Sequence, residues 1–499
     1  MAGQLVVFIH GWSARSTDAY GRLPERLRAG AAAHGVQLDV EHVYLGKYVS
    51  FRDEVRLEDV SRALEAALRG EPRLRQALDD GRRLAMITHS TGGPVARDWW
   101  HRYYVAPGRP CPLSHLVMLA PANFGSALAQ LGKGTLSRLK HWFQGVEPGQ
   151  GILDWLELGS PEAWRLNESW VTQSPGWQAA SRVFPFVLTG QTIDRKLYDH
   201  VNSYTDEAGS DGVVRVAAAS LGASCVQLVQ RGDPRAWEAG GRSGALELAV
   251  AATAQAPRTA LAVLPGVAHA GARLGIMRSV GPQAPHPTVD AVLKCLAVAD
   301  DAGYAALCDA FDALTAATQA AELNVKVERL LLADRTFRNA PGTQVIVRVR
   351  DDAGYQLDDF DFLLTACDPG HRRGALRKPD PNLLPEGFFL DRQRNRRARG
   401  TLCYYLDHER LSQAPALGVL VRPRPAAPAG TGRMSGHFVH YVPAELAADA
   451  DSLRPFIRPN ATLLLDIVLR RVVRAGTFRL TRDLEPKDFT RDGPGDIVD

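Results

Sequence analysis

The sequence predicts an α/β domain followed by an all-β domain, and three observations support this prediction. Within the first 300 residues, short apolar runs alternate with segments whose apolar residues have helical spacing. These runs are continuously apolar, which is typical of strands buried on both faces of a parallel sheet. Past about residue 320, helical periodicity largely disappears, and short apolar segments are separated by Pro, Gly and Asp residues.

The first domain is expected to contain one parallel sheet covered by helices. Helices are predicted at residues 20–33 and 60–78, and an alanine-rich helix at 302–321 would connect the two domains. The predicted strands occupy residues 5–9, 36–45, 84–88, 113–120, 183–189, 225–229 and 260–264. Because strands alternate with helices throughout, residues 1–320 are assigned to one α/β domain.

The second domain, residues 321–499, is expected to be an antiparallel, sandwich-like β domain. About eight short strands are predicted in it, with little helical pattern between them. They occupy residues 325–332, 344–350, 360–366, 401–406, 418–422, 436–442, 461–473 and 477–480. Clustered carboxylates could suggest a calcium site, but the order lacks an EF-hand pattern, so solvated strand edges and no metal site are expected. These aspartates are Asp351, Asp352, Asp358, Asp359, Asp361 and Asp368.

Composition excludes several classes of protein. A chain of 499 residues with 45% hydrophobic and 23% charged residues is typical of an ordinary globular protein of more than one domain. The six cysteines lie far apart without a C-x-x-C pair, so neither a zinc ribbon nor a disulfide framework is indicated. No apolar run reaches the roughly 18 residues of a membrane span, and the N-terminus lacks a signal-type segment. A cytoplasmic protein is therefore expected.

The formal net charge is +4, and basic residues cluster in the second domain. The densest run contains Arg392, Arg394, Arg396, Arg397 and Arg399. One interpretation is a solvated loop. The other is a surface of the C-terminal domain that contacts anionic lipid headgroups at a membrane. No nucleic-acid partner is expected, because no recognised binding motif and no aromatic-studded basic stripe is present.

A serine in a turn between a predicted strand and a predicted helix is the strongest chemical signal. Residues 85–96 read Ala-Met-Ile-Thr-His-Ser-Thr-Gly-Gly-Pro-Val-Ala, with Ser90 in the turn. This segment resembles the nucleophile elbow of the α/β-hydrolase family, in which a sharp turn projects a serine above the sheet. Gly92 is the small residue that such a turn needs, whereas Thr88 replaces the usual glycine. The Thr91 N–H at the helix start would be directed at a developing oxyanion. The alternative is a buried serine that caps the helix.

The first predicted strand ends in His10-Gly11-Trp12. In the hydrolases that this chain resembles, a His-Gly pair closes the strand that supplies the second oxyanion donor. The resemblance therefore assigns the Trp12 N–H to the oxyanion hole. Gly11 would permit close approach, and His10 would brace the loop. The alternative is a plain turn between a strand and a loop.

A serine nucleophile needs a general base that titrates near neutrality, which indicates a histidine. Among fourteen histidines, His269 is the best placed, because it follows the apolar run 261–267 and this family has the chain order Ser, acid, His. His200 precedes the preferred acid, and His286, just before Pro287, is expected to start a helix. The histidines of the second domain are expected to be ordinary polar residues: His371, His408, His437 and His440.

The preferred acid is Asp211, in the segment Gly-Ser-Asp-Gly-Val-Val at 209–214. This segment resembles the one that carries the triad aspartate in several bacterial lipases. A carboxylate there would fix the histidine tautomer and stabilise the imidazolium. Asp194, Asp199 and Asp206 are alternatives, and Asp-Gly is also a common turn signal.

An insertion of about residues 123–175 follows the fourth predicted strand. It is rich in Trp and Leu and cannot belong to the sheet itself. One interpretation is a helical subdomain packed on the core. The other is an apolar lid over an acyl-chain pocket, opened at a lipid surface. Trp142, Phe143 and Trp155 are its candidate substrate-binding residues.

Together these motifs identify residues 1–300 as similar to bacterial α/β-hydrolases of the lipase and phospholipase type. The resemblance implies cofactor-free hydrolysis of acyl esters of lipids by Ser90, Asp211 and His269. It does not extend to residues 321–499, and protein partners are not predicted. Some proteobacterial lipase effectors lack a signal peptide and are delivered into rival cells, which would bring a cytoplasmic protein to a lipid substrate. The alternatives are a soluble carboxylesterase or acyltransferase, and a non-catalytic lipid-binding adaptor.

Overall fold

The structure is a computed structural model of the chain. It describes residues 3–10, 20–45, 52–131, 149–179, 182–193, 208–240, 244–327, 335–366, 386–414, 416–426, 438–448 and 451–473. Several residues singled out in the sequence lie outside these ranges: Trp12, Trp142, Phe143, Asp194, Asp199, His200, Asp206, Asp368, His371 and His437. The strand predicted at residues 477–480 also lies outside them.

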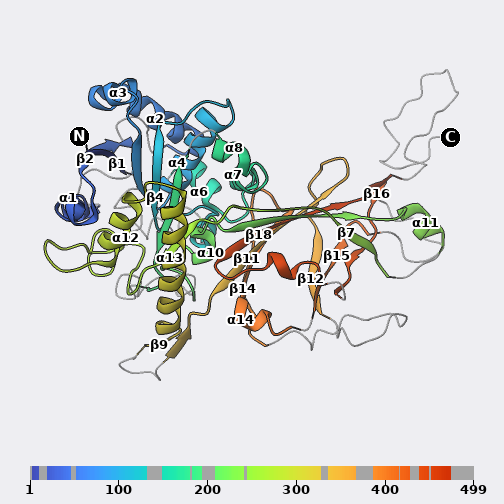
Figure 1. The fold of residues 1–499 in the computed structure, drawn as a ribbon. Helices are drawn as coiled ribbons and strands as arrows, with labels where there is room; N and C mark the ends of the chain where they lie inside the picture. Colours follow the sequence, from blue (N-terminus) through green and yellow to red (C-terminus); the bar gives the residue numbers. More distant parts are fainter. Residues whose placement is uncertain are drawn as a thin grey trace, which may run out of the picture.

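The first domain is built on a six-stranded sheet of order β2-β1-β3-β4-β5-β8 (Figure 1). Every neighbouring pair in it is parallel, as predicted. The strands are β1 (Gln4–His10), β2 (Leu38–Tyr44), β3 (Leu84–His89), β4 (Leu113–Leu119), β5 (Phe184–Thr189) and β8 (Ala260–Val263). A parallel sheet directs the carboxyl ends of all its strands to one edge, where functional groups can meet.

Helices cover both faces of this sheet, which explains why its strands are apolar throughout. On one face, Leu5 and Val7 of β1 share a buried cluster with residues of α2 (Leu57–Gly70) and α4 (Gly92–Trp100). On the other face, Val6 and Phe8 share a cluster with three helices. These are α1 (Leu23–Gly30), α12 (Pro287–Leu296) and α13 (Asp301–Ala321). The short helix α3 (Pro72–Asp79) follows α2.

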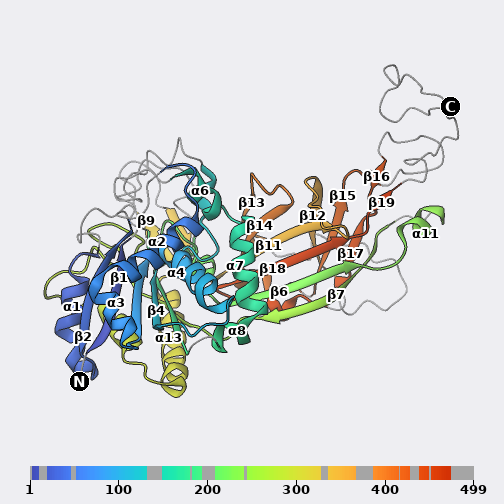
Figure 2. The same cartoon turned by 90° about the horizontal axis from the view of Figure 1, so that it is seen from above.

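A helical insertion separates β4 from β5, where the sequence predicts one. It contains η5 (Ala127–Leu131), α6 (Gln150–Leu156), α7 (Pro161–Thr172) and α8 (Ser174–Ala179). The Ser160 side chain caps α7 by accepting from the N–H of Ala163. In Figure 2, α7 lies between the first sheet and the long strands of the second sheet.

The second sheet has nine strands in the order β12-β15-β17-β7-β6-β18-β11-β14-β13. The sequence predicted an antiparallel sheet, but this sheet is mixed, because the pairs β11–β18, β18–β6 and β17–β7 are parallel. The strands are β6 (Ala223–Gln230), β7 (Leu246–Gln255), β11 (Gly342–Asp351), β12 (Phe360–Ala366), β13 (Phe389–Arg394), β14 (Thr401–Asp407), β15 (Leu417–Pro423), β17 (Ala444–Leu446) and β18 (Ala461–Leu469).

Strand β6 corrects the sequence prediction in one respect. The sequence assigned residues 225–229 to the parallel sheet, but β6 pairs with β18 and β7 in the second sheet. Residues 1–320 are therefore not one uninterrupted α/β unit, because the chain enters the second sheet at β6 and returns at β8. A buried strand has the same apolar pattern in either sheet, so its partner cannot be read from the pattern.

The second sheet coils around its own apolar core, which makes the domain sandwich-like, as predicted. The rings of Phe362 in β12 and Tyr404 in β14 lie 5.4 Å apart between centroids, although these strands are distant in the sheet order. At the two edges, Arg394 of β13 donates a hydrogen bond to the carbonyl of Asp358, two residues before β12. The right-handed twist of neighbouring strands accumulates over a wide sheet and produces such coiling.

Smaller elements complete the described part of the chain. They are η2 (Ala31–His34), η4 (His101–Val105), α10 (Val216–Ala219), α11 (Pro234–Ala239), β9 (Asn324–Val327), β10 (Arg335–Arg338), α14 (His408–Leu411), β16 (Val439–His440), η10 (Arg454–Phe456) and β19 (Val472–Val473). Among the described residues, no helix is long and apolar enough to cross a membrane.

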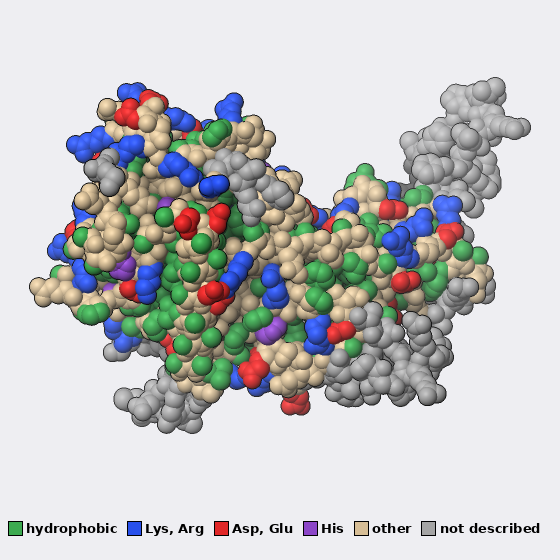
Figure 3. All heavy atoms as spheres, in the orientation of Figure 1, with side chains coloured by type: hydrophobic (Ala, Val, Ile, Leu, Met, Phe, Trp, Pro, Cys, Tyr) green, Lys and Arg blue, Asp and Glu red, His purple; other side chains and the backbone are tan. Residues whose placement is uncertain are grey.

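Two arginines of the basic run join the second domain to the insertion, although their side chains are about half exposed: 46% for Arg396 and 49% for Arg397. Glu157, whose side chain is 1% exposed, accepts from the backbone N–H of Arg396 at 2.8 Å and from its guanidinium. Arg397 lies 3.5 Å from Asp154 and 3.7 Å from Glu162. The basic run is therefore partly neutralised within the molecule. On the face drawn in Figure 3, basic and acidic side chains are interspersed.

Several aspartates of the second domain are engaged in local bonds. Asp351 is buried, which differs from the solvated position expected, and it accepts from the backbone N–H groups of Ala353 and Tyr355. Asp359 and Asp361 both pair with Arg424. Within the described ranges, no three metal-ligating side chains are grouped to hold an ion.

Candidate active site

Ser90 occupies a strained turn at the carboxyl edge of the first sheet, between β3 and α4. Its φ angle is +52°, in the left-handed region that residues other than glycine rarely adopt. Neighbouring backbone holds this conformation: the Ser90 N–H donates to Leu119 at 2.9 Å, and its carbonyl accepts from Gly93 at 3.1 Å. The turn thus has the geometry of the predicted nucleophile elbow.

Close packing explains the small residues around this turn. A Cβ atom at Gly93 would lie 2.6 Å from Cβ of Pro121, which no real structure tolerates. A Cβ atom at Gly92 would lie 3.3 Å from Cβ of Thr88. In this turn the residue two before the serine lies close to the residue two after it, and the former is usually a glycine. Here Gly92 has no side chain, so Thr88 fits at the position two before the serine.

The two other predicted catalytic side chains meet Ser90 at this edge. The hydroxyl of Ser90 donates to Nε2 of His269 at 3.0 Å, and the Nδ1–H of His269 donates to Oδ2 of Asp211 at 2.9 Å. The side chains of His269 and Asp211 are fully buried. Because water is excluded from the pair, the charge of Asp211 acts on the imidazole with little screening.

The segment around Asp211 orients its carboxylate. Oδ1 accepts from the backbone N–H groups of Val213 at 3.0 Å and Val214 at 2.8 Å. The carbonyl of Asp211 accepts from the backbone N–H of His269 at 3.0 Å. With Oδ1 held by two donors, Oδ2 is directed at the imidazole, so the carboxylate has one orientation.

His89 is a residue of this site that the sequence analysis did not single out. Its Nε2–H donates to the carbonyl of His269 at 3.1 Å, and the two rings lie 4.9 Å apart. Burial, together with the proximity of His269, lowers the pKa of His89 to about 3. His89 is therefore neutral at physiological pH and supports the loop that carries the proposed base. The feature of the sequence that could have indicated His89 is its position directly before Ser90.

Replacing His89 by glutamine is expected to make the free energy of unfolding less dependent on pH in the acidic range. The unfolded chain binds a proton at His89 near pH 6.5, whereas the folded chain does so only near pH 3. The stabilisation by neutral His89 is thus complete above pH 6.5 and is lost as the pH falls toward 3. Glutamine keeps an N–H donor but does not titrate. The slope of the free energy of unfolding against pH should therefore decrease by at most about 1.4 kcal/mol per pH unit.

Urea unfolding of both proteins between pH 7 and pH 4 measures this slope. Equal slopes for the native chain and His89→Gln would contradict the position assigned to His89.

The remaining predicted site residues have mixed outcomes. Thr91 is buried at the start of α4, next to Ser90, where its N–H was expected. Trp12, Trp142 and Phe143 lie outside the described residues. Trp155 of α6 is 4% exposed and packs in the hydrophobic core.

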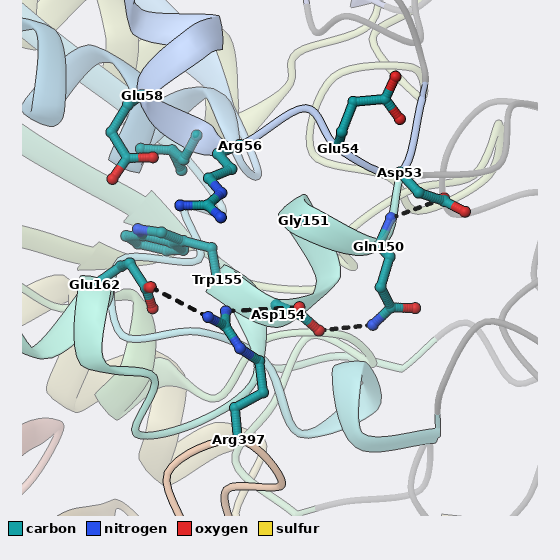
Figure 4. Close-up of a pocket in the computed structure, with 11 residues that line it drawn as sticks. Asp53, Glu54, Arg56, Glu58, Gln150, Gly151, Asp154, Trp155, Glu162 and Arg397 are labelled. Atoms are coloured by element: carbon teal, nitrogen blue, oxygen red, sulfur yellow. Dashed lines mark hydrogen bonds and ion pairs between the residues drawn. The ribbon is translucent and has the colours of Figure 1, made fainter.

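Trp155 also lines a pocket of about 250 Å³ whose other walls are mainly charged. Figure 4 shows Arg397 directed between Asp154 and Glu162, with the Trp155 indole beside Arg56. A charged pocket of this kind does not suit an acyl chain, so the substrate-binding assignment of Trp155 stays a prediction.

The competing histidines that the structure describes lie elsewhere. His286 caps α12 by accepting from the N–H of Thr288, as predicted. His440 pairs with Glu238, and His408 begins α14 in the second domain. Of the described histidines, His269 is the one that bonds to the Ser90 hydroxyl.

Two solved structures are similar to the whole chain. Phospholipase PlaB from Legionella pneumophila superposes with a TM-score of 0.83 at 38% sequence identity, with 98% of each chain covered. Its complex with thio-NAD gives a TM-score of 0.81 at 36% identity, with 99% of this chain and 100% of that chain covered. The chain belongs to the PlaB family.

Membership in the PlaB family confirms two predictions from the sequence. The chain is a bacterial α/β-hydrolase of the lipase and phospholipase type, and a β domain follows the hydrolase domain. Because 98% of this chain is covered, the match also includes most of residues 321–499, for which the sequence resembled nothing known. A scan against models of protein families found no match, and no curated protein matches the chain.

Proposed function

We propose that the protein is a phospholipase that hydrolyses carboxylic ester bonds of membrane lipids through an acyl-enzyme on Ser90. The observation that carries this proposal is the continuous hydrogen-bond chain from the Ser90 hydroxyl through His269 to Asp211. Nucleophile, base and orienting acid lie within bonding distance, which is the arrangement that acyl transfer requires. The lipid substrate is inferred from the similarity to phospholipase PlaB.

In the first half-reaction, Oγ of Ser90 attacks the ester carbonyl carbon while Nε2 of His269 accepts the hydroxyl proton. The oxyanion would accept from the N–H of Thr91 and, by the family resemblance, from that of Trp12. Each such donor contributes about 2.7–4 kcal/mol to transition-state stabilisation. Collapse of the tetrahedral species breaks the ester bond, and the imidazolium of His269 protonates the leaving alkoxide.

In the second half-reaction, His269 deprotonates a water molecule that attacks the acyl-enzyme, and the fatty acid leaves as Ser90 is regenerated. Asp211 stays ionised throughout and stabilises the imidazolium. One PlaB structure holds thio-NAD. Because ester hydrolysis transfers no hydride, the proposed reaction has no step for that dinucleotide.

We also propose that the insertion is a lid. Trp155 is buried, so it can contact an acyl chain only if α6 moves, and movement at a lipid surface is what the lid hypothesis requires. For the membrane contact of the second domain we propose the edge strand β13, where Phe389 is 46% and Leu390 38% exposed next to the exposed Arg392. Aromatic and basic side chains together suit the interface of an anionic bilayer. The cytoplasmic location and the export route stay predictions from the sequence.

Fatty-acid release from vesicles of phosphatidylcholine and phosphatidylglycerol tests the substrate class. The comparison substrates are p-nitrophenyl esters with acyl chains of increasing length. A phospholipase should release fatty acid from the vesicles and prefer long acyl chains. A preference for short soluble esters would indicate a carboxylesterase, and absence of turnover on every substrate would indicate a non-catalytic adaptor. Either result would overturn the proposal.

A further inference from the structure

The segment that carries Asp211 lies where the chain passes from the first sheet to the second. The last strand before it, β5, belongs to the hydrolase sheet, and the next strand, β6, belongs to the nine-stranded sheet. The two ends of the segment are joined, because the N–H of Val216 donates to the carbonyl of Gly209 at 3.0 Å. Asp211 therefore lies in a short closed loop between the two domains.

One end of this loop is held by β14 of the second sheet. The hydroxyl of Tyr405 donates to the carbonyls of Ala208 at 3.2 Å and Gly209 at 3.3 Å. Gly209 has a φ angle of +68°, and a Cβ atom there would lie 2.5 Å from the Tyr405 hydroxyl. The loop thus approaches this strand as closely as a glycine allows.

The other end of the loop is held by Arg215. Its side chain is 1% exposed and forms an ion pair with Asp391 of β13. Its guanidinium lies 4.4 Å from the centre of the Tyr405 ring and 3.5 Å from Oε1 of Gln344 in β11. A buried guanidinium is stable only in such a set of partners. Three strands of the second sheet therefore determine where Arg215, four residues after Asp211, can lie.

The hydrolase domain also holds the same loop. The hydroxyl of Ser126 donates to the carbonyl of Val213 at 2.6 Å, and the backbone N–H of His269 donates to Asp211 itself. Beyond the loop, Thr462 of β18 donates to the carbonyl of Ala217 at 3.0 Å. Contacts from the second sheet thus flank the proposed catalytic acid on both sides along the chain.

We propose that the nine-stranded sheet is part of the catalytic apparatus, with Tyr405 and the Arg215–Asp391 pair as positioning residues that hold Asp211 in register with His269. This inference rests on the proposed triad. It assigns to the β domain a role in the chemical step, separate from any contact with lipid. A shift of about 1 Å in a catalytic group can cost about 100-fold in rate, so small losses of support should be measurable.

The test is a double-mutant cycle on Tyr405 and Asp211, measured as kcat and KM on a soluble p-nitrophenyl ester. Tyr405→Phe removes the hydroxyl and is expected to lower kcat about 10-fold with KM changed by less than about 2-fold. In a chain that already carries Asp211→Asn, the same substitution should lower kcat by less than about 2-fold, because the group it positions is gone. A merely structural residue would lower kcat equally in both backgrounds.

Tyr404→Phe is the matched control. It removes a tyrosine hydroxyl from the same strand, but that hydroxyl bonds to Phe362 within the second domain. It should leave kcat unchanged. Asp391→Asn is the second variant and should reproduce the behaviour of Tyr405→Phe, with thermal unfolding recorded to detect loss of folded protein.

The outcomes distinguish failure of the proposed triad from failure of the positioning role. If Asp211→Asn alone leaves kcat unchanged, the proposed triad fails and this inference fails with it. If Asp211→Asn lowers kcat but Tyr405→Phe has the same effect in both backgrounds or no effect in either, the triad stands and the positioning role is overturned.

Discussion

Replacing Ser90 by alanine is expected to abolish measurable hydrolysis, with a fall in kcat on the order of 10⁶-fold. The Oγ atom is the proposed nucleophile, and it lies 3.0 Å from Nε2 of His269. Fatty-acid release from phospholipid vesicles measures the loss. Covalent labelling by a fluorophosphonate, which should disappear in Ser90→Ala, reports on the serine itself.

Ser114→Ala is the matched control for this experiment. Ser114 lies at the opposite end of the same sheet, in β4, where its hydroxyl bonds to the carbonyl of Leu84. It should keep native activity and labelling. Native turnover by Ser90→Ala would refute the proposed mechanism.

Replacing Asp211 by asparagine is expected to lower kcat about 10⁴-fold. The amide oxygen can still accept from Val213 and Val214, so the amide NH₂ would face Nδ1 of His269. That contact favours the tautomer with a proton on Nε2, which cannot accept the proton of Ser90. Nε2 of His269 can therefore no longer act as the base, although the shape of the site is kept.

Steady-state kinetics should show the loss in kcat with little change in KM, because Asp211 does not contact the substrate. Asp300→Asn is the control, since Asp300 caps α13 by accepting from Gly303 and asparagine caps a helix equally well. A decrease below about 10-fold for Asp211→Asn would show that another group orients the imidazole.

Local sequence, together with the family resemblance, predicted the three side chains that the structure brings together: Ser90, Asp211 and His269. Ser90 lies in a turn whose neighbours must be small, and this requirement is visible in a few consecutive residues. Asp211 and His269 follow from the family's chain order and from the segments around them. The structure brings the three together because β3 and β8 end at one edge of a parallel sheet, while the acid loop lies next to that edge.

Sequence alone also determined that helices would cover a parallel sheet and that a β domain would follow. Leu5 to Ile9 are apolar at every position, which requires cover on both faces. The tertiary structure decided the partners of each strand. Residues 223–230 carry the same apolar pattern that a strand of either sheet would have, and only long-range pairing with β18 places them in the second sheet.

The contacts that position the acid loop were likewise decided only by the fold. Arg215 and Asp391 are 176 residues apart along the chain. Such a pair has no local signature, because hydrogen bonding and charge depend on distance in space and not along the chain. Sequence therefore predicted which residues would carry the chemistry, whereas the contacts that surround them depend on how the two sheets meet.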